Sequence, residues 1–345
     1  MIRFNNDYSE GALPQIIEAL TRTNLEQTSG YGTDDYCKTA AQYIKSACDA
    51  ADAGVHLLVG GTQTNLVVIS SVLRTHQAVL CVQSGHISTH ETGAIEACGH
   101  KVMTVKGENA KIRAKDIYDV YSEHYSDPDH EHITQPKLVY ISNSTEWGTI
   151  YTKKELSEIS AACKKCGFYL FLDGARLGYA LTSSENDLTL ADVAKYCDVF
   201  YIGGTKCGAL FGEAVVITND ALKSDFRYVM KQKGALLAKG RLLGVQFCEL
   251  FRDGLYFKAC EGANGLAMKI RDAFASKGYS FRYESPTNQQ FPILSPEEIK
   301  KLSEKYVFST DSEKIDERHI AVRFCTSWAT KPEDVDALVH DILAL

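Results

Sequence analysis

The sequence lacks the long apolar segments that mark membrane and secreted proteins. No hydrophobic run approaches the length of a bilayer-spanning helix, and residues 1–5 contain no apolar core of a signal peptide. An excess of basic residues is also lacking, since the formal net charge is -7. This charge argues against a nucleic-acid groove or an anionic membrane surface as the main partner. We therefore expect a cytoplasmic protein that binds neither nucleic acid nor membrane.

The sequence also lacks a disulfide framework and a metal-binding motif. Its eleven cysteines are odd in number and scattered, which is typical of free and mostly buried thiols. Cys163 and Cys166 form a single CxxC without a second pair, so a redox site is only the alternative interpretation. His130 and His132 lie in a polar stretch, residues 126–135, without rigid ligand spacing. We therefore predict a solvated surface loop there and no metal site.

What the chain does contain is typical of a globular enzyme. Its 345 residues are 45% hydrophobic and 23% charged, and the length suffices for one large and one small domain. We find no internal repeats and no low-complexity linker. The pattern of predicted elements changes near residue 240. We therefore predict an N-terminal arm with a large domain over residues 1–240 and a small domain over residues 241–345.

Apolar runs of strand length alternate with helical patterns along the large domain. The expected strands are residues 55–59, 78–82, 101–105, 138–141, 168–172, 199–202 and 214–218. The expected helices are residues 36–51, 64–75, 90–97, 114–124, 152–166 and 188–197. This alternation predicts an α/β fold with a mainly parallel seven-stranded sheet that helices cover on both faces. The last strand follows its predecessor too closely for a crossover helix, so it should run antiparallel.

The last hundred residues read as a smaller α+β domain. A long helical region extends to residue 277, and short strands are expected at 279–283 and 290–294. A helix from Pro296, strands around Val307 and Ile320, and a closing helix from Pro332 complete the pattern.

Lys206 and Asp173 form the most informative pair of the chain. Each follows a predicted strand, so both side chains should leave the carboxyl edges of neighbouring parallel strands, where open α/β sheets bind ligands. A lysine among glycines can form a Schiff base, and a fixed aspartate can hold a pyridinium nitrogen. Pyridoxal phosphate requires this pair. Singly, Asp173 could cap a helix and Lys206 could be a solvated lysine, but together they favour the cofactor.

A phosphate site is predicted where the strand at 55–59 turns into the next helix. Gly60 and Gly61 allow a close backbone approach, and the hydroxyls of Thr62 and Thr205 could bind the same anion. The simpler interpretation is a helix cap.

His86 follows the strand at 78–82 and is our candidate for stacking on the cofactor ring. The competing interpretation is a zinc site made of His86, His90 and Glu91 at helical spacing. We disfavour it because an HxxxH without the internal Glu of zincins is common by chance.

These residues together resemble the low-specificity threonine aldolase family, within the β-eliminating lyase group of fold-type-I PLP enzymes. The resemblance covers most of the chain, and its most specific parts are the Asp-Gly-Ala-Arg segment and the lysine. It rests on Tyr31-Gly32 with Asp34-Asp35, Gly61-Thr62 with Asn65, Gly85-His86 with Glu91, Asp173-Gly174-Ala175-Arg176, Thr205-Lys206 and Val322-Arg323-Phe324-Cys325-Thr326-Ser327-Trp328.

The resemblance implies a role for each candidate. Lys206 would carry the cofactor and shuttle protons, and Asp173 would keep the ring nitrogen protonated. Arg176 and Arg323 would clamp the substrate carboxylate, a task suited to a planar guanidinium, and Arg176 would also belong to the cofactor site. Asn6 would contact the same carboxylate.

Two further candidates imply sites that are shared between subunits. Tyr31 matches a family segment that reaches the substrate, and Arg241 matches an arginine that binds the cofactor phosphate, often across the subunit interface. A charge on the helix surface is the alternative for Arg241. We expect a homodimer or homotetramer with shared active sites.

One segment departs from the family. The family carries Glu-Asn-Thr-His after the strand at 138–141, and its histidine handles the substrate hydroxyl. This chain has Ser142-Asn143-Ser144-Thr145-Glu146-Trp147-Gly148 instead. Thr145 and Glu146 are the nearest polar substitutes, and Glu146 could act as a base if it is partly buried. It could equally be a surface carboxylate.

The sequence therefore predicts a PLP-dependent lyase that acts on a small L-amino acid. Cleavage of a β-hydroxy amino acid to glycine and an aldehyde is the leading reaction. β-Elimination or transamination is the alternative within PLP chemistry. A metal-dependent hydrolase using His86, His90 and Glu91, or a non-catalytic protein of this fold, is the alternative from another class.

Overall fold

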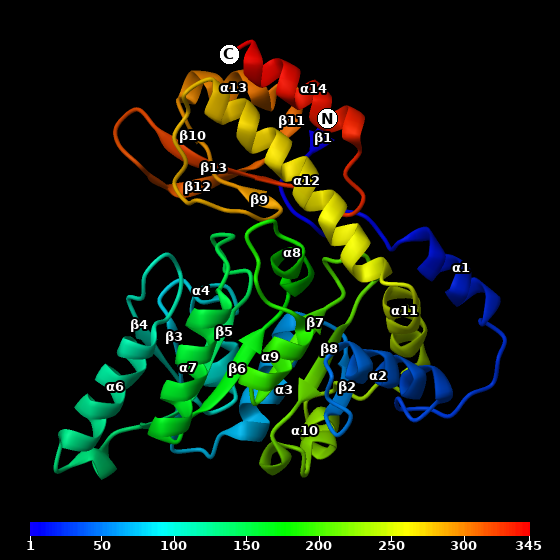
Figure 1. Cartoon of the computed structure of the whole chain (residues 1–345), viewed down its shortest axis with the longest axis vertical. Coiled ribbons are helices and arrows are strands. Elements are labelled where there is room, and N and C mark those ends of the chain that lie inside the picture. Colours follow the sequence, from blue (N-terminus) through cyan, green and yellow to red (C-terminus); the bar gives the residue numbers. More distant parts are fainter.

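The computed structural model describes the backbone of residues 1–345 and all side chains except those of residues 311–314. Figure 1 shows two parts, a larger one around a central sheet and a smaller one above it that contains both termini of the chain.

The larger part is built on a seven-stranded sheet of order β2-β8-β7-β6-β5-β3-β4. Neighbours from β7 to β4 pair in parallel, whereas β8 pairs antiparallel with both β7 and β2. The predicted mainly parallel sheet and the predicted antiparallel strand at 214–218 are therefore confirmed. The strands are β2 (Gly54–Leu58), β3 (Gln77–Val82), β4 (Lys101–Val105), β5 (Gln135–Ser142), β6 (Tyr169–Asp173), β7 (Val199–Gly203) and β8 (Glu213–Ile217).

Helices cover both faces of this sheet. Those of the larger part are α1 (Pro14–Arg22), α2 (Asp35–Ala47), α3 (Gly61–Val72), α4 (His86–Thr89), α5 (Ala94–Ala97), α6 (Ala114–Ser126), α7 (Lys153–Cys166), α8 (Leu177–Leu181), α9 (Leu190–Tyr196), α10 (Phe226–Gln232) and α11 (Arg241–Arg252). Short 3₁₀ turns lie at η1 (His130–His132) and η2 (Asp220–Leu222).

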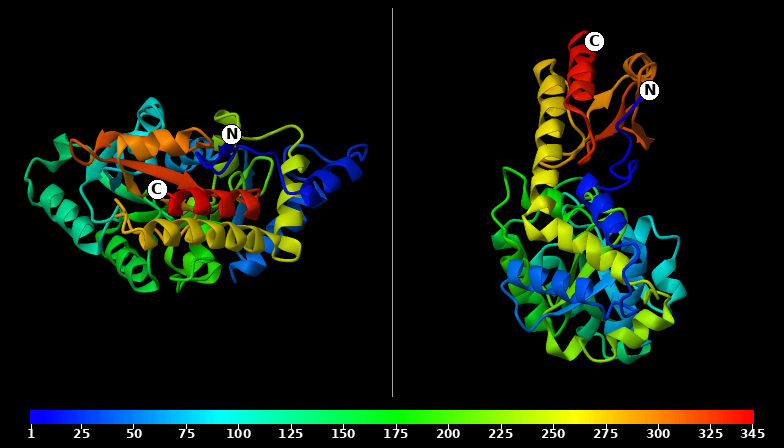
Figure 2. Two further views of the ribbon diagram at one scale, coloured as in Figure 1. Left: turned by 90° about the horizontal axis from the view of Figure 1, so that it is seen from above. Right: turned by 90° about the vertical axis from the view of Figure 1, so that its right-hand side faces the viewer.

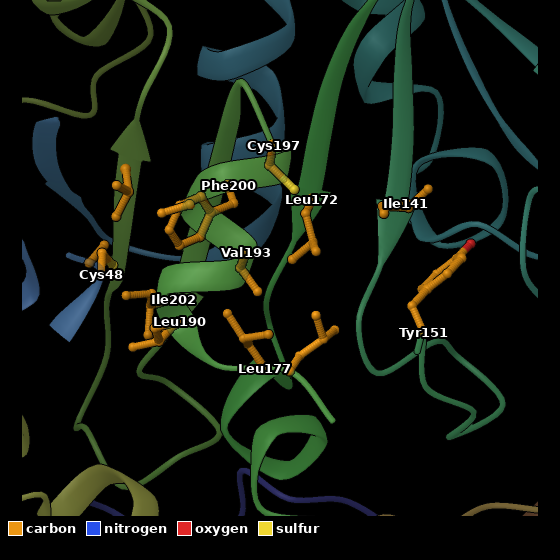
Figure 3. Close-up of a cluster of buried hydrophobic side chains, with 14 of the residues drawn as sticks. Cys48, Ile141, Tyr151, Leu172, Leu177, Leu190, Val193, Cys197, Phe200 and Ile202 are labelled. Atoms are coloured by element: carbon orange, nitrogen blue, oxygen red, sulfur yellow. The ribbon is translucent and has the colours of Figure 1, made fainter. Parts of the chain in front are cut away.

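Two separate cores lie on the two faces because strand side chains alternate. Phe171 packs with residues of α3, α5 and α10. Its neighbours Leu170 and Leu172 point the other way and pack with residues of α2, α6, α7, α9 and α11. Figure 3 shows this second core, where Leu172 and Phe200 face Val193 of α9. Burial of each such side chain contributes about 1.5–3 kcal/mol.

The smaller part combines short strands with long helices. It contains α12 (Leu255–Ser276), β9 (Gln289–Gln290), β10 (Ile293–Leu294), α13 (Pro296–Ser303), β11 (Tyr306–Val307), β12 (Ser309–Lys314), β13 (Ile320–Cys325) and α14 (Pro332–Leu343). Strand β13 pairs with β9, β10 and β12, and Figure 2 shows α12 and α14 side by side along this small sheet. Strand β1 (Ile2–Arg3) pairs in parallel with β11, so the N-terminal arm joins the smaller part. Helix α11 instead packs on α1 and α2, and the boundary at residues 240/241 stays a prediction.

Four predicted elements differ from the structure, and one of them, the predicted strand at 290–294, is divided into β9 and β10. The predicted helix at 90–97 is helical only from Ala94, in α5, because Thr92 and Gly93 take φ values of 54° and 69° and interrupt it. The long helical region is divided into α11 and α12 at Gly254, which has a φ of 69°. Residues 279–283 form an isolated bridge from Phe281 to Pro292 and no strand. Residues in the left-handed region cannot continue a helix, which explains both interruptions.

No helix among the described residues is long and apolar enough to cross a membrane.

Candidate active site

A cavity of about 590 Å³ lies where the parallel strands end at their carboxyl edge. Residues that follow β2, β3, β5, β6 and β7 line it, together with Glu213 at the start of the antiparallel β8 and Arg323 of β13. Eight predicted site residues meet at this cavity: Gly61, Thr62, His86, Asp173, Arg176, Thr205, Lys206 and Arg323.

Asp173 is the most strongly fixed polar side chain of the cavity. It ends β6, is 5% exposed, and accepts hydrogen bonds of 2.5 Å from both the Tyr140 and Tyr201 hydroxyls. The amide Nδ2 of Asn65 donates to the same carboxylate at 3.2 Å, and the backbone N–H of Ala175 donates at 2.9 Å. Such a set of donors stabilises a buried ionised carboxylate.

Lys206 is half-buried at the cavity wall, just beyond the end of β7. Burial and the charge of Arg176 lower the pKa of its amine below the ordinary value, although nearby carboxylates oppose the shift. Its backbone carbonyl accepts a hydrogen bond from the Tyr179 hydroxyl at 2.6 Å, which fixes the turn. A Cβ at Gly203 would lie only 2.4 Å from the Ala175 carbonyl oxygen, so this turn requires glycine there.

Glu213 lies beside this turn and is 3% exposed. It accepts hydrogen bonds from the Thr205 hydroxyl at 2.8 Å and from the Gly204 N–H at 3.2 Å. Burial raises the pKa of Glu213 to about 8, although these hydrogen bonds and the charge of Lys206 oppose the shift. Because Thr205 also accepts from the Gly212 N–H at 3.0 Å, its hydroxyl is already engaged within the turn.

His86 is tied to Asp173 through two other polar side chains. Its Nδ1 lies 2.8 Å from Oε1 of Glu91, and the same oxygen accepts a hydrogen bond from Asn65 at 2.7 Å. Burial lowers the pKa of His86, but the hydrogen bond to Glu91 and the charges of Asp173 and Glu91 outweigh it and raise the pKa above its usual value. The chain of contacts fixes the ring at the cavity wall.

The start of α3 provides a site for an anion. Gly60, Gly61 and Thr62 line the cavity, and the N-cap Gly60 supplies no side chain to cap the first turn. The N–H groups of a first turn attract anions, so this helix start fits a phosphate. A Cβ at Gly61 would lie 3.1 Å from the Tyr201 hydroxyl that binds Asp173.

The two arginines of the cavity differ in their contacts. Nε and Nη2 of Arg176 form a forked pair with Asp7, at 2.7 and 3.0 Å, so the arm holds this guanidinium. Nη2 of Arg323 donates to the Asn5 carbonyl at 2.9 Å and Nη1 to Gln289 at 3.2 Å. Its buried Nε has no hydrogen-bond partner among the described side chains and backbone.

Asn6, Tyr31 and Arg241 do not line the cavity of their own chain. The Asn6 side chain is used within its turn, where it accepts hydrogen bonds from the Tyr8 N–H and the Ser9 hydroxyl. Tyr31 is 46% exposed, has a φ of 58°, and lies under the Lys231 ammonium at 4.7 Å.

The guanidinium of Arg241 is directed into its own subunit. It donates to the backbone carbonyls of Thr23 and Glu26 and to the Thr23 hydroxyl, and the residue is 8% exposed. The alternative of a helix-surface charge is therefore wrong, because Arg241 is buried. Its role toward a phosphate stays a prediction.

The departing segment after β5 lies at the cavity. Ser142, Ser144 and Glu146 line it, whereas Thr145 is buried and its hydroxyl is paired with that of Thr149 at 2.7 Å. Glu146 is half-buried rather than a surface carboxylate.

Sequence reasoning missed four polar groups of the site: Tyr8, Tyr140, Tyr201 and Glu213. Tyr140 and Tyr201 lie inside apolar strand patterns that predict core residues. Two signals could have found three of these residues, and the sequence offers none for Tyr8. Tyr140 and Tyr201 each lie an even number of residues before the end of their strand, on the face toward α3. Glu213 is the one carboxylate at the start of an otherwise apolar strand.

No group of three His, Cys, Asp or Glu side chains that could hold a metal ion occurs among the described side chains. The rings of His86 and His90 are 5.6 Å apart, and Glu91 is engaged with His86 and Asn65.

Sheet order and site together define a class of protein. The solved structure of a serine palmitoyltransferase with a PLP internal aldimine superposes on this chain with a TM-score of 0.73, at 15% identity, over 99% of this chain and 86% of that one. The fold is therefore that of the fold-type-I PLP-dependent enzymes.

Closer relatives narrow this class. The model of the family described as beta-eliminating lyase matches residues 7–280. The low specificity L-threonine aldolase of a Pseudomonas species is 30% identical over 99% of this chain and 97% of its own length. That of Pseudomonas aeruginosa is 28% identical over 99% and 96%. The solved structure of the Leishmania major threonine aldolase is 48% identical with a TM-score of 0.96, over 99% of this chain and 98% of that one. This chain belongs to the beta-eliminating lyase family.

Proposed function

We propose that this protein cleaves a β-hydroxy-L-amino acid to glycine and an aldehyde, with pyridoxal phosphate as its cofactor. One observation carries the proposal: the amine of Lys206 and the buried carboxylate of Asp173 line one cavity at the carboxyl edge of the sheet. The names of the relatives from Pseudomonas and Leishmania major support the same reaction.

The residues of the cavity fit this cofactor. Lys206 supplies the amine that attaches it, and the pKa shift of Lys206 favours the neutral, nucleophilic form. Asp173 is held by four donors at a fixed position, as the partner of a protonated ring nitrogen must be. The first turn of α3, which no side chain caps, would hold the phosphate, and a Cβ at Gly60 would meet no atom within 4 Å there.

When bound, pyridoxal phosphate supplies an electron sink for the bond that breaks at Cα. The chain's own residues orient the substrate and move protons. The Nε of Arg323 lacks a hydrogen-bond partner among the described residues, so Arg323 is the cation that would bind the substrate carboxylate. Arg176 is held by Asp7 and raises the positive potential of the same wall. His86, fixed by Glu91, lines the same cavity and would supply the ring that stacks on the cofactor.

The proposal includes a homodimer or homotetramer with shared sites. Tyr31 is exposed outside its own cavity, as a residue that reaches a neighbouring site must be. All eleven cysteines are free, which supports function in a reducing compartment such as the cytoplasm.

The test is a panel of amino acids scored for aldehyde, keto acid or ammonia, using wild type and Lys206→Ala. We expect aldehyde and glycine from β-hydroxy amino acids. Lys206→Ala should lose both turnover and the visible absorption of attached cofactor. Lys101→Ala, which changes an exposed lysine of β4, is the control and should keep both. Ammonia and a keto acid as the main products would overturn the proposed reaction, and a borohydride-reducible attachment to another lysine would overturn the role of Lys206.

A further inference from the structure

Among the described carboxylates of the cavity, Glu146 is the one to which the proposed function assigns no role. Asp173 holds the cofactor ring, and Glu213 accepts hydrogen bonds from the turn of Lys206. Glu91 is bound to His86 and Asn65. Glu146 lies on the segment after β5 and lines the same cavity.

One oxygen of Glu146 is anchored and the other is free. Its Oε1 accepts hydrogen bonds from the Ser142 hydroxyl at 2.8 Å and from the His86 N–H at 3.0 Å. Its Oε2 is buried and has no hydrogen-bond partner among the described groups. A buried, unpartnered carboxylate oxygen is costly, so a protein retains one where a ligand or a proton completes it.

The two anchors place this carboxylate next to residues of the cavity wall. Ser142 is paired with Asp173 in the register of β5 and β6, so one anchor is adjacent to the residue that holds the cofactor ring. The other anchor is the backbone of His86, whose side chain also lines the cavity. The ring of the next residue, Trp147, stacks on Tyr283 with centroids 4.1 Å apart, which limits movement of the segment.

We propose that Glu146 is the catalytic base that takes the proton of the substrate β-hydroxyl during cleavage; this inference rests on the proposed function. The hydroxyl proton moves to the carboxylate, and the O–H electron pair forms the carbonyl of the aldehyde. The Cα–Cβ bond breaks, and the electron sink that a bound cofactor would supply would hold its electron pair until Cα is protonated. After the aldehyde leaves, Cα takes up one proton to give glycine, and Glu146 returns its proton to solvent.

The electrostatics agree with this assignment. Burial raises the pKa of Glu146 above its usual value, which brings it closer to the operating pH of a general base. The pKa of His86 is also raised, so the imidazole is more often a cation, which donates hydrogen bonds and cannot take a proton.

The experiment compares two reactions of the cofactor-loaded enzyme. Cleavage of a β-hydroxy amino acid requires a base at the hydroxyl. Exchange of the glycine Cα hydrogen with D₂O requires the cofactor and Lys206 but involves no hydroxyl. Glu146→Gln keeps an oxygen that accepts from Ser142 and His86 but cannot take the proton. We expect kcat for cleavage to fall by about 10²–10⁴-fold, while glycine exchange stays within a few-fold of wild type.

A control variant and a pH profile distinguish a catalytic role of Glu146 from a structural one. Asp198→Asn changes a partly buried carboxylate outside the cavity, which accepts hydrogen bonds from the Leu170 N–H and the Asn219 amide, each at 2.8 Å. It should keep both activities. The acid limb of kcat/KM in wild type should disappear in Glu146→Gln.

Equal losses of cleavage and exchange in Glu146→Gln would make Glu146 a structural cap of α4 and overturn the assignment. Unchanged cleavage would overturn it too. If the wild-type enzyme exchanged the glycine hydrogen but cleaved no β-hydroxy amino acid, the proposed function would be wrong. The assignment of Glu146 as the catalytic base would then be wrong as well.

Discussion

At the scale of single residues, the ion pair between Asp7 and Arg176 joins the N-terminal arm to the end of β6. The Asp7 side chain is fully buried, and that of Arg176 is 12% exposed. The Asn288 amide donates to the same carboxylate at 3.0 Å. Three parts of the chain that are far apart in sequence therefore meet at the wall of the cavity.

Breaking this pair should destabilise the protein more than its formation stabilises it, because a buried charge would remain alone. We expect Asp7→Asn to lower the free energy of unfolding at pH 7 by about 3 kcal/mol, measured by urea unfolding. Asp35→Asn is the control, since its pair with Lys38 is exposed, and should leave the free energy of unfolding nearly unchanged.

The difference in free energy of unfolding between wild type and Asp7→Asn should depend on pH in one direction. Burial raises the pKa of Asp7, but Arg176, Lys206 and two hydrogen bonds outweigh it and lower the pKa to about 2. The unfolded chain takes up this proton near pH 3.8, so the stabilisation is complete above that pH and is lost toward pH 2. The difference in free energy of unfolding between wild type and Asp7→Asn should therefore become smaller as the pH falls from 3.8 toward 2. If this difference grew on acidification, the stabilising role of the ion pair would be contradicted.

At the same scale, some site residues could be predicted and others could not. Lys206 and Asp173 follow apolar strands directly, so the rule that ligands bind at carboxyl edges located them. The partners of Asp173 could not be located in the same way. Tyr140 and Tyr201 come from β5 and β7, and only the register of three strands brings their hydroxyls to one carboxylate.

At the scale of elements, the apolar pattern predicted the sheet well because most of its strands are buried on both faces. The strand β7, for example, is buried along its whole length, and such an apolar run is hard to mistake. Helix boundaries depended on single residues instead. The long region after residue 240 is periodic throughout, and only the left-handed Gly254 divides it. Residues 279–283 carry a strand pattern, but one bridge does not extend into a ladder.

The segment after β5 is fixed to the smaller part through Gly148. This glycine has a φ of 73°, and its carbonyl accepts hydrogen bonds from the Ser285 and Thr287 hydroxyls at 3.2 and 3.1 Å. A Cβ there would lie 2.1 Å from the Ser285 oxygen. Both the backbone conformation and the space therefore require glycine.

We expect Gly148→Ala to lower the free energy of unfolding by about 2–4 kcal/mol, from backbone strain and overpacking together. Displacing this segment should also reduce cleavage, because Glu146 lies two residues away. Gly262→Ala in the middle of α12 is the control, since no atom lies within 4 Å of the added Cβ. It should stabilise the protein by about 0.5–1 kcal/mol. Thermal unfolding should give a lower melting temperature for Gly148→Ala than for Gly262→Ala. Equal melting temperatures would contradict the requirement for glycine at position 148.

At the scale of the whole molecule, the cavity lies between the two parts of the chain. The sheet edge supplies Lys206 and Asp173, while Arg323 comes from β13 of the smaller part. The residue Tyr31, which the family resemblance assigns to a substrate site, lies outside this cavity on the surface of the larger part. A site that requires Tyr31 must therefore be completed by a second copy of the chain.

Mixing two inactive variants tests this sharing directly. Lys206→Ala subunits retain Tyr31, and Tyr31→Ala subunits retain Lys206. If Tyr31 acts in the neighbouring subunit, a mixed dimer contains one site with both residues and one site with neither. Unfolding and refolding an equal mixture should then restore about a quarter of the wild-type activity, because half of the dimers are mixed and each has one intact site. Light scattering should give a dimer or a larger assembly throughout. No recovery of activity above that of the separate variants, or a fully active monomer, would show that each site is complete within one chain.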